Sequence, residues 1–150
     1  MKIQEDELTK ALQHPSTRRQ AFEQVVRDHS QDLYSLIRRM VLDHDDTDDI
    51  LQDVFVKAWL SLPSFRGESK VSSWLYRIAY NECLQFLQKK KNQVSLDSTE
   101  GTIANQLMAD QYFDGDEMEA KFQEAIQTLP DKQRMVFCMK YFQEMKYEDI

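Results

Sequence analysis

In the stretch FRGESKVSSWLYRIAYN, residues 65–81, the sequence pattern of a loop is followed by that of a helix. Gly67 lies in the loop half, and Ser72 precedes Leu75 and Ile78, which have the spacing of a buried helix face. Four aromatic side chains and three cations also alternate here, although the chain carries a formal charge of −7. The stretch therefore predicts a helix, and it raises the question why an acidic protein gathers side chains typical of a nucleic-acid surface.

Helical spacing recurs on both sides of this stretch, and no segment alternates as a strand would. The chain has 150 residues but only three Gly and three Pro, a composition that favours helices joined by short connections. Ser16 or Thr17 is expected to cap one helix and Ser30 the next. We predict an all-α fold whose helices cover 3–13, 17–29, 30–41, 50–59, 72–91, 118–129 and 130–142.

The periodicity disappears in residues 92–115, which are rich in Ser, Asp, Asn, Thr and Gly. We interpret this segment as a flexible acidic linker. It divides the chain into a helical module of residues 1–91 and a smaller one of residues 116–150, which we expect to be only marginally stable alone.

Charge is distributed in blocks along the chain. Residues 43–53 contain six acids and no Lys or Arg, and residues 97–119 contain seven acids and no cation. Between them, residues 60–91 contain six cations against two acids. The first acidic block precedes a predicted helix, where negative charge is favourable. The basic block is the candidate DNA-binding surface.

The sequence lacks the patterns of catalytic and metal sites. A calcium loop starting at Asp45 would need Gly and Glu where Ile50 and Val56 stand. Cys83 and Cys138 are far apart in the sequence and are expected to be buried thiols in a reducing compartment. We therefore expect no enzyme activity, cofactor or metal. The polar N-terminus and the lack of a long apolar run predict a cytoplasmic protein that does not insert into membranes.

One face of the predicted helix combines polar and aromatic side chains at separations of three and four: Ser73, Tyr76, Arg77, Tyr80 and Asn81. Such a face can stack unpaired bases on its rings and hold phosphate with its guanidinium. The preceding loop adds Arg66, Gly67 and Lys70. The alternative is that the aromatic residues pack in the core and that Lys89–Lys91 are a solvated helix end.

Four segments in this order resemble bacterial sigma factors, most closely the small extracytoplasmic-function type. The segments are AFEQVVRDHSQDLYSLIRRMV (21–41), DDTDDILQDVFVKAWLSLPSFRG (45–67), VSSWLYRIAYNECLQFLQKKK (71–91) and AIQTLPDKQRMVFCMKYFQEMKYEDI (125–150). The resemblance implies a subunit that binds core RNA polymerase and recognises and melts the promoter −10 element. It also implies an anti-sigma factor as a partner.

The resemblance assigns roles to particular residues. It places Asp49, Gln52, Asp53 and Phe55 on the helix that docks on the clamp helices of the largest polymerase subunit. It places residues 65–74 in the promoter-melting segment and residues 76–91 in the helix that reads the −10 non-template strand. The DNA-binding residues so implied are Phe65, Arg66, Gly67, Lys70, Ser73, Trp74, Tyr76, Arg77, Tyr80, Asn81, Lys89 and Lys90.

The C-terminal segment resembles only the start of the −35-reading domain. Its last residues, YEDI, normally begin a helix-turn-helix, but the recognition helix would follow Ile150. We therefore expect this sequence to be a fragment, and no residue is assigned to −35 recognition. Two other functions remain open from the residues themselves: a stand-alone helix-turn-helix regulator that binds duplex DNA without polymerase, and a helical protein-interaction module.

Overall fold

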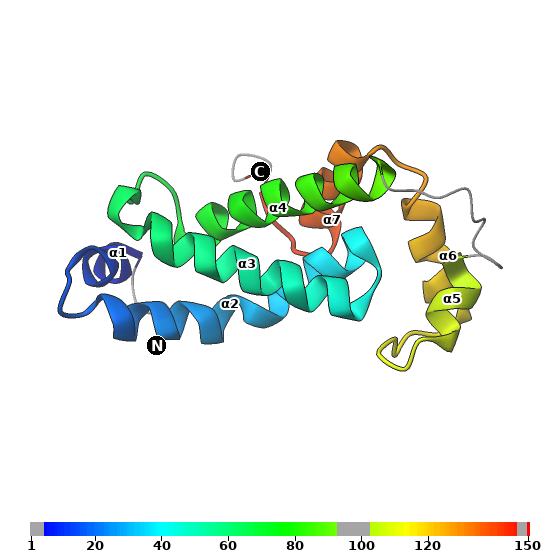
Figure 1. The fold of residues 1–150 in the computed structure, drawn as a ribbon, viewed down its shortest axis with the longest axis horizontal. Coiled ribbons are helices and arrows are strands. Elements are labelled where there is room, and N and C mark those ends of the chain that lie inside the picture. Colours follow the sequence, from blue (N-terminus) through cyan, green and yellow to red (C-terminus); the bar gives the residue numbers. More distant parts are fainter. Residues whose placement is uncertain (1–4, 93–102, 147–149) are drawn as a thin grey trace.

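The computed structural model describes residues 5–92, 103–146 and 150. These residues form helices and no strand, which confirms the all-α prediction (Figure 1). None of the helices in this part of the chain combines the length and apolar content of a membrane span. The elements are α1 (Glu5–Gln13), α2 (Arg18–Val41), α3 (His44–Ser61), the 3-10 turn η1 (Leu62–Ser64), α4 (Val71–Asn92), α5 (Ile103–Ala109), α6 (Glu117–Ile126) and α7 (Asp131–Tyr141).

Residues 18–41 form one long helix, α2, where the sequence predicts two, over 17–29 and 30–41. Ser30, the expected cap, lies inside α2, and its hydroxyl donates to the carbonyl oxygen of Val26. A serine inside a helix can satisfy its hydroxyl in this way without ending the helix. The helix ends instead at Leu42, whose φ of 69° is left-handed and whose N–H donates to the Arg38 carbonyl.

The acidic block forms the first turns of α3, which begins at His44, six residues before the predicted helix of residues 50–59. The carboxylate of Asp43 is the N-cap and accepts from the backbone N–H of Asp46 at 2.9 Å. This bond satisfies one of the amide donors that a helix leaves free at its first turn. Asp45 and Asp46 follow in the same turn, where negative charge is favourable.

Three long helices, α2, α3 and α4, lie side by side and supply most of the core (Figure 1). Helix α1 packs against α2 and buries Leu12. The buried side chains that these helices share include Leu36, Ile37, Val54 and Leu75. This packing turns one side of α3 and one side of α4 outward.

Residues beyond the predicted linker pack on the same core. Ile126, Met135, Cys138 and Met139 belong to one cluster with the buried residues of α2, α3 and α4. Both cysteines are buried, as predicted, and neither forms a disulfide. The boundaries 1–91 and 116–150 stay a prediction, but the described residues on either side of the linker share a hydrophobic core.

The predicted linker contains a helix that the sequence pattern missed. Residues 103–109 form α5, and Ala104 and Leu107 pack against Ala120 of α6. The helix has only seven residues, too few for a clear periodicity, and its contact with α6 stabilises it instead. Residues 93–102 of the predicted linker lie outside the described residues.

Candidate nucleic-acid and partner-binding surfaces

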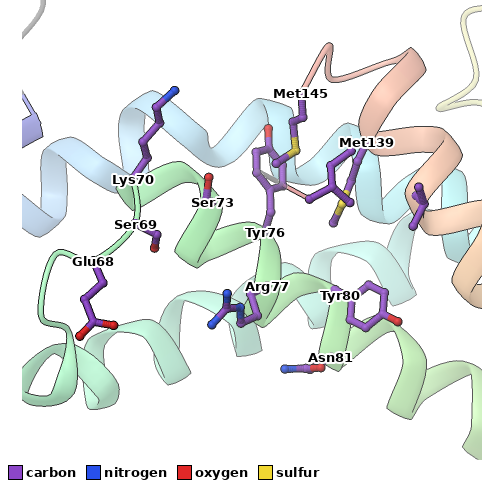
Figure 2. Close-up of a pocket in the computed structure, with 12 residues that line it drawn as sticks. Glu68, Ser69, Lys70, Ser73, Tyr76, Arg77, Tyr80, Asn81, Met139 and Met145 are labelled. Atoms are coloured by element: carbon purple, nitrogen blue, oxygen red, sulfur yellow. The ribbon is translucent and has the colours of Figure 1, made fainter. Parts of the chain in front are cut away.

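The polar-aromatic face predicted for α4 lines one cavity of about 530 Å³. Figure 2 shows these side chains along α4 and the loop before it. Six of the predicted DNA-binding residues line the cavity: Lys70, Ser73, Tyr76, Arg77, Tyr80 and Asn81. The structure therefore brings together the residues that the helical spacing placed on one face.

Tyr76 is the most buried member of this group, with 7% of its surface exposed. Its hydroxyl donates to the side-chain oxygen of Gln143 at 3.2 Å, and Met139 and Met145 line the same cavity. Burial raises the pKa of Tyr76 to about 12, and the negative charge of Asp32 adds to this effect. In this conformation, the ring is packed by the C-terminal part of the chain and is not open for base stacking.

The loop before α4 forms a second cavity of about 600 Å³, lined by residues 64–69, Trp74 and Arg77. Phe65 is buried, and its ring stacks on Trp74 at a centroid distance of 4.7 Å. Its backbone carbonyl accepts from the side-chain amide of Gln13 at 2.9 Å. Phe65 thus positions the loop and Trp74, while Arg66 and Arg77 are exposed.

Arg77 lines both cavities and so links the loop to the face of α4. Its exposed guanidinium can bind the backbone phosphate of a nucleotide whose base lies in either cavity. Lys89 and Lys90 are exposed further along α4, where they extend the positive surface.

The backbone conformation at residue 67 and the side chain next to it both favour glycine. Its φ is 75°, in the left-handed region. A Cβ at this position would lie 2.6 Å from the Cγ2 atom of Thr9 in α1. The close approach is therefore to the chain's own first helix, which packs under the loop.

The residues predicted to bind polymerase separate into two environments. Asp49, Gln52 and Asp53 are exposed on α3. Phe55 is half-buried instead, with its ring edge-on to Phe22 at a centroid distance of 6.3 Å. Phe55 therefore supports the surface from beneath.

Two further exposed residues extend the same side of α3. Val56 is 50% exposed and Leu60 is 70% exposed. Together with Asp49, Gln52 and Asp53 they fall at helical intervals of three and four, so they form one stripe, the α3 stripe, with a polar end and an apolar end. Neither residue was predicted from the sequence as part of a binding surface, although both lie at helical spacing from Asp49.

Metal ligands do not cluster in the described parts of the chain. Within residues 5–92 and 103–146, no group of three or more His, Cys, Asp and Glu side chains is arranged to hold a metal ion.

Two family models match the chain in the order that the sequence suggests. The model described as Sigma-70 region 2 matches residues 25–93, and the model described as Sigma-70, region 4 matches residues 119–150. The first match contains the loop cavity, the α4 side of the other cavity and the α3 stripe. The second contains most of α6, all of α7 and the residues that follow.

Curated relatives match over most of their length. The chain is 35% identical over 140 residues to the ECF RNA polymerase sigma factor SigW of Bacillus subtilis, with 87% of this chain and 75% of that protein covered. It is 30% identical over 157 residues to the RNA polymerase sigma-H factor of Pseudomonas aeruginosa, with 98% and 80% covered. RNA polymerase sigma factor SigV of Bacillus subtilis is 30% identical over 125 residues, with 83% and 72% covered.

Proposed function

Because the chain belongs to the extracytoplasmic-function group of RNA polymerase sigma factors, we propose that two of its surfaces have separate roles in transcription initiation. The exposed stripe of α3 binds core polymerase. The face of α4, together with the loop before it, holds the −10 element of the promoter as the duplex opens. The observation that carries this proposal is the position of Arg77, which lines the cavities of both the loop and the helix.

The DNA-binding part of the proposal follows from the chemistry of the two cavities. Melting requires that a base leaves the stack, and a protein pocket offsets the cost of a few kcal/mol for unstacking. The loop cavity has room for such a base next to Trp74, whose own position is fixed by stacking on Phe65. Arg77 and Asn81 are exposed and suited to the phosphate and the base edges of the non-template strand.

The polymerase-binding part follows from the composition of the α3 stripe. Asp49, Gln52 and Asp53 provide carboxylate and amide oxygens, which suit an arginine-rich partner surface such as the clamp helices. Val56 and Leu60 add exposed apolar area next to these polar groups. We further propose that an anti-sigma factor captures this surface, since the captor would then block polymerase directly, and that the chain acts in the cytoplasm.

Polymerase binding is tested with Asp49→Ala combined with Gln52→Ala. We expect at least about a ten-fold weaker affinity for core RNA polymerase by fluorescence anisotropy, because the loss of two central polar contacts costs more than about 1.4 kcal/mol. Asp28→Ala with Gln31→Ala is the matched control, since it removes an exposed acid and an exposed amide at the same spacing from α2. Equal affinities of the two variants would contradict the proposal.

Promoter melting is tested with Arg77→Ala. We expect this variant to bind core polymerase normally and to lose open complexes, measured by permanganate reactivity of promoter thymines. The guanidinium lies between the two cavities and not on α3, so only the DNA step should respond. An equal loss of polymerase binding would show that the substitution disturbs the fold and would remove the assignment of Arg77.

A further inference from the structure

Helix α1 packs against the turn that leads into the promoter-melting loop. Figure 1 shows α1 next to the end of α3, and α1 contacts the 3-10 turn η1 there. Leu12 of α1 is fully buried in the core that this helix shares with α2, α3 and α4. The helix lies before residues 25–93, the part of the chain that matches region 2, so the match assigns it no role.

Two side chains of α1 contact the backbone of the loop. The side-chain amide of Gln13 donates to the carbonyl oxygen of Phe65 at 2.9 Å. Thr9 lies against Gly67, where a Cβ would come within 2.6 Å of its Cγ2 atom. These two contacts lie on either side of Arg66 in the sequence. They therefore hold the loop at the point where its side chains become exposed.

The bond from Gln13 acts on the wall of the loop cavity. Phe65 is the last buried residue before residues 66–70, which are all exposed. Its ring stacks on Trp74, and both residues line the cavity. A shift of the Phe65 backbone would therefore move the ring, change its stacking on Trp74 and alter the shape of the cavity.

The start of α2 holds α1 in place. The last carbonyls of a helix have no partner within the helix, and a cation is favourable near them. Nε and Nη2 of Arg18 donate to the carbonyl oxygens of Leu12 and Gln13, at 2.9 and 3.1 Å. The hydroxyl of Thr17 donates to the carbonyl oxygen of Ala11 at 2.7 Å. These bonds fix the end of α1, which carries Gln13, relative to α2.

We propose that α1 supports the promoter-melting loop and that Gln13 is a positioning residue for base capture. Its bond to the Phe65 carbonyl keeps the loop cavity in the shape that receives the unstacked base. This inference rests on the proposed function, because it concerns the same loop. A loop that is already ordered loses less conformational entropy when the base binds. If the loop is held for only part of the time, the apparent affinity for the opened strand falls in proportion to that fraction.

The anchoring of the loop is tested without polymerase, by limited trypsin digestion of Gln13→Met. This substitution keeps the length of the side chain and removes the donor. We expect cleavage after Arg66 to be about three-fold faster or more than in the native chain, because the loop loses a hydrogen bond to α1. Gln20→Met is the matched control, since it makes the same change at an exposed glutamine of α2. Equal cleavage rates in the two variants would overturn the anchoring.

Base capture is tested in the complete initiation complex. A promoter is first selected from a random-sequence library by polymerase that carries the native chain. Fragments with each of the four bases at successive non-template positions of its −10 element then measure base preference, read as permanganate reactivity of the opened thymines. At the position where the native chain discriminates most, we expect Gln13→Met to lower the preference by about three-fold or more. Gln20→Met should keep the native preference.

Base preference separates positioning from a general loss of stability. A less stable fold would lower open-complex formation on all fragments alike, and an unchanged preference in Gln13→Met would overturn its role in base capture. Binding of core polymerase should be equal in the native chain and in Gln13→Met, because Gln13 lies outside the α3 stripe. Failure of the native chain to bind polymerase would contradict the proposed function itself, whatever the trypsin digestion shows.

Discussion

At Gly67 the backbone conformation and the neighbouring helix require the same residue. A non-glycine residue with a left-handed φ costs about 1–2 kcal/mol. The Cγ2 atom of Thr9 leaves too little room for a Cβ. The loop that presents Arg66 therefore depends on a position with no side chain.

Gly67→Ala is expected to lower the free energy of unfolding by about 1–2 kcal/mol and the melting temperature by roughly 4 °C. Gly115→Ala is the steric control, because its Cβ would lie 2.6 Å from Phe113 and 2.8 Å from Glu119, at least as crowded as the site at Gly67, while its φ is not positive. A larger loss of stability for Gly67→Ala than for Gly115→Ala in thermal unfolding therefore reports the backbone strain. Equal destabilisation would contradict a role for the left-handed conformation.

The two thiols predict how stability depends on pH. Burial raises the pKa of Cys83 to about 12 and that of Cys138 to about 11. Above about pH 9, the unfolded chain releases these protons while the folded chain retains them. The free energy of unfolding therefore falls as pH rises, by on the order of 1 kcal/mol for each thiol at about pH 10.

Urea unfolding at about pH 8 and about pH 10 measures this effect. Cys83→Ala with Cys138→Ala should reduce the dependence on pH, although it lowers the stability at both values. If the double variant loses as much stability between the two pH values as the native chain, thiol ionisation is not the cause.

At the scale of the element, the acidic block before α3 has two separable roles. Asp43 stabilises the helix through its bond to the Asp46 amide. Asp49 and Asp53 lie further along, exposed and available to a partner. One run of acids thus caps a helix at its start and forms a binding surface along its side.

Asp43→Ala is expected to cost about 1 kcal/mol of stability, because it leaves the Asp46 amide without its partner. Asp43→Asn should recover most of the loss, since an asparagine oxygen accepts the same bond. Chemical denaturation of the two variants measures the difference. Similar losses in both would point to the charge of Asp43, and not to the capping bond, as the source of stability.

At the scale of the whole molecule, α7 belongs to the core of the helices that precede the linker. Met135 is fully buried in the cluster that contains α2, α3 and α4. Both tryptophans, Trp59 and Trp74, lie before the linker. Tryptophan fluorescence therefore reports the unfolding of the first part of the chain alone.

Met135→Ala is expected to lower the stability reported by tryptophan fluorescence by about 2 kcal/mol or more, because the cavity left in α7 opens into the shared core. Met118→Ala, at a position 79% exposed, should change it by less than about 0.5 kcal/mol. If Met135→Ala leaves the stability reported by tryptophan fluorescence unchanged, the two parts of the chain unfold independently.

The sequence alone determined the features that depend on neighbours along one helix. The spacing around Leu75 and Ile78 predicted α4 and its polar-aromatic face, and the run of acids predicted that a helix N-terminus lies near it, although α3 begins at His44 and not at residue 50. The prediction of a cap at Ser30 was wrong, because a serine hydroxyl also fits inside a helix, where it bonds to Val26. Capping preference cannot separate these two positions when the apolar stripe continues on both sides.

Only the tertiary structure decided which part of the polar-aromatic face of α4 is covered. Helical spacing places Tyr76 on the same face of α4 as Arg77 and Asn81. Tyr76 is nevertheless buried, because residues 139–145 pack on it. That packing depends on bonds from Gln127 and Arg134 to the end of α2, between residues about ninety positions apart. Helical periodicity reflects interactions within one turn or two, so it specifies which residues share a face. Whether that face is buried depends on which distant segment packs there. The same periodicity fits a face that binds DNA and a face that another segment of the chain covers.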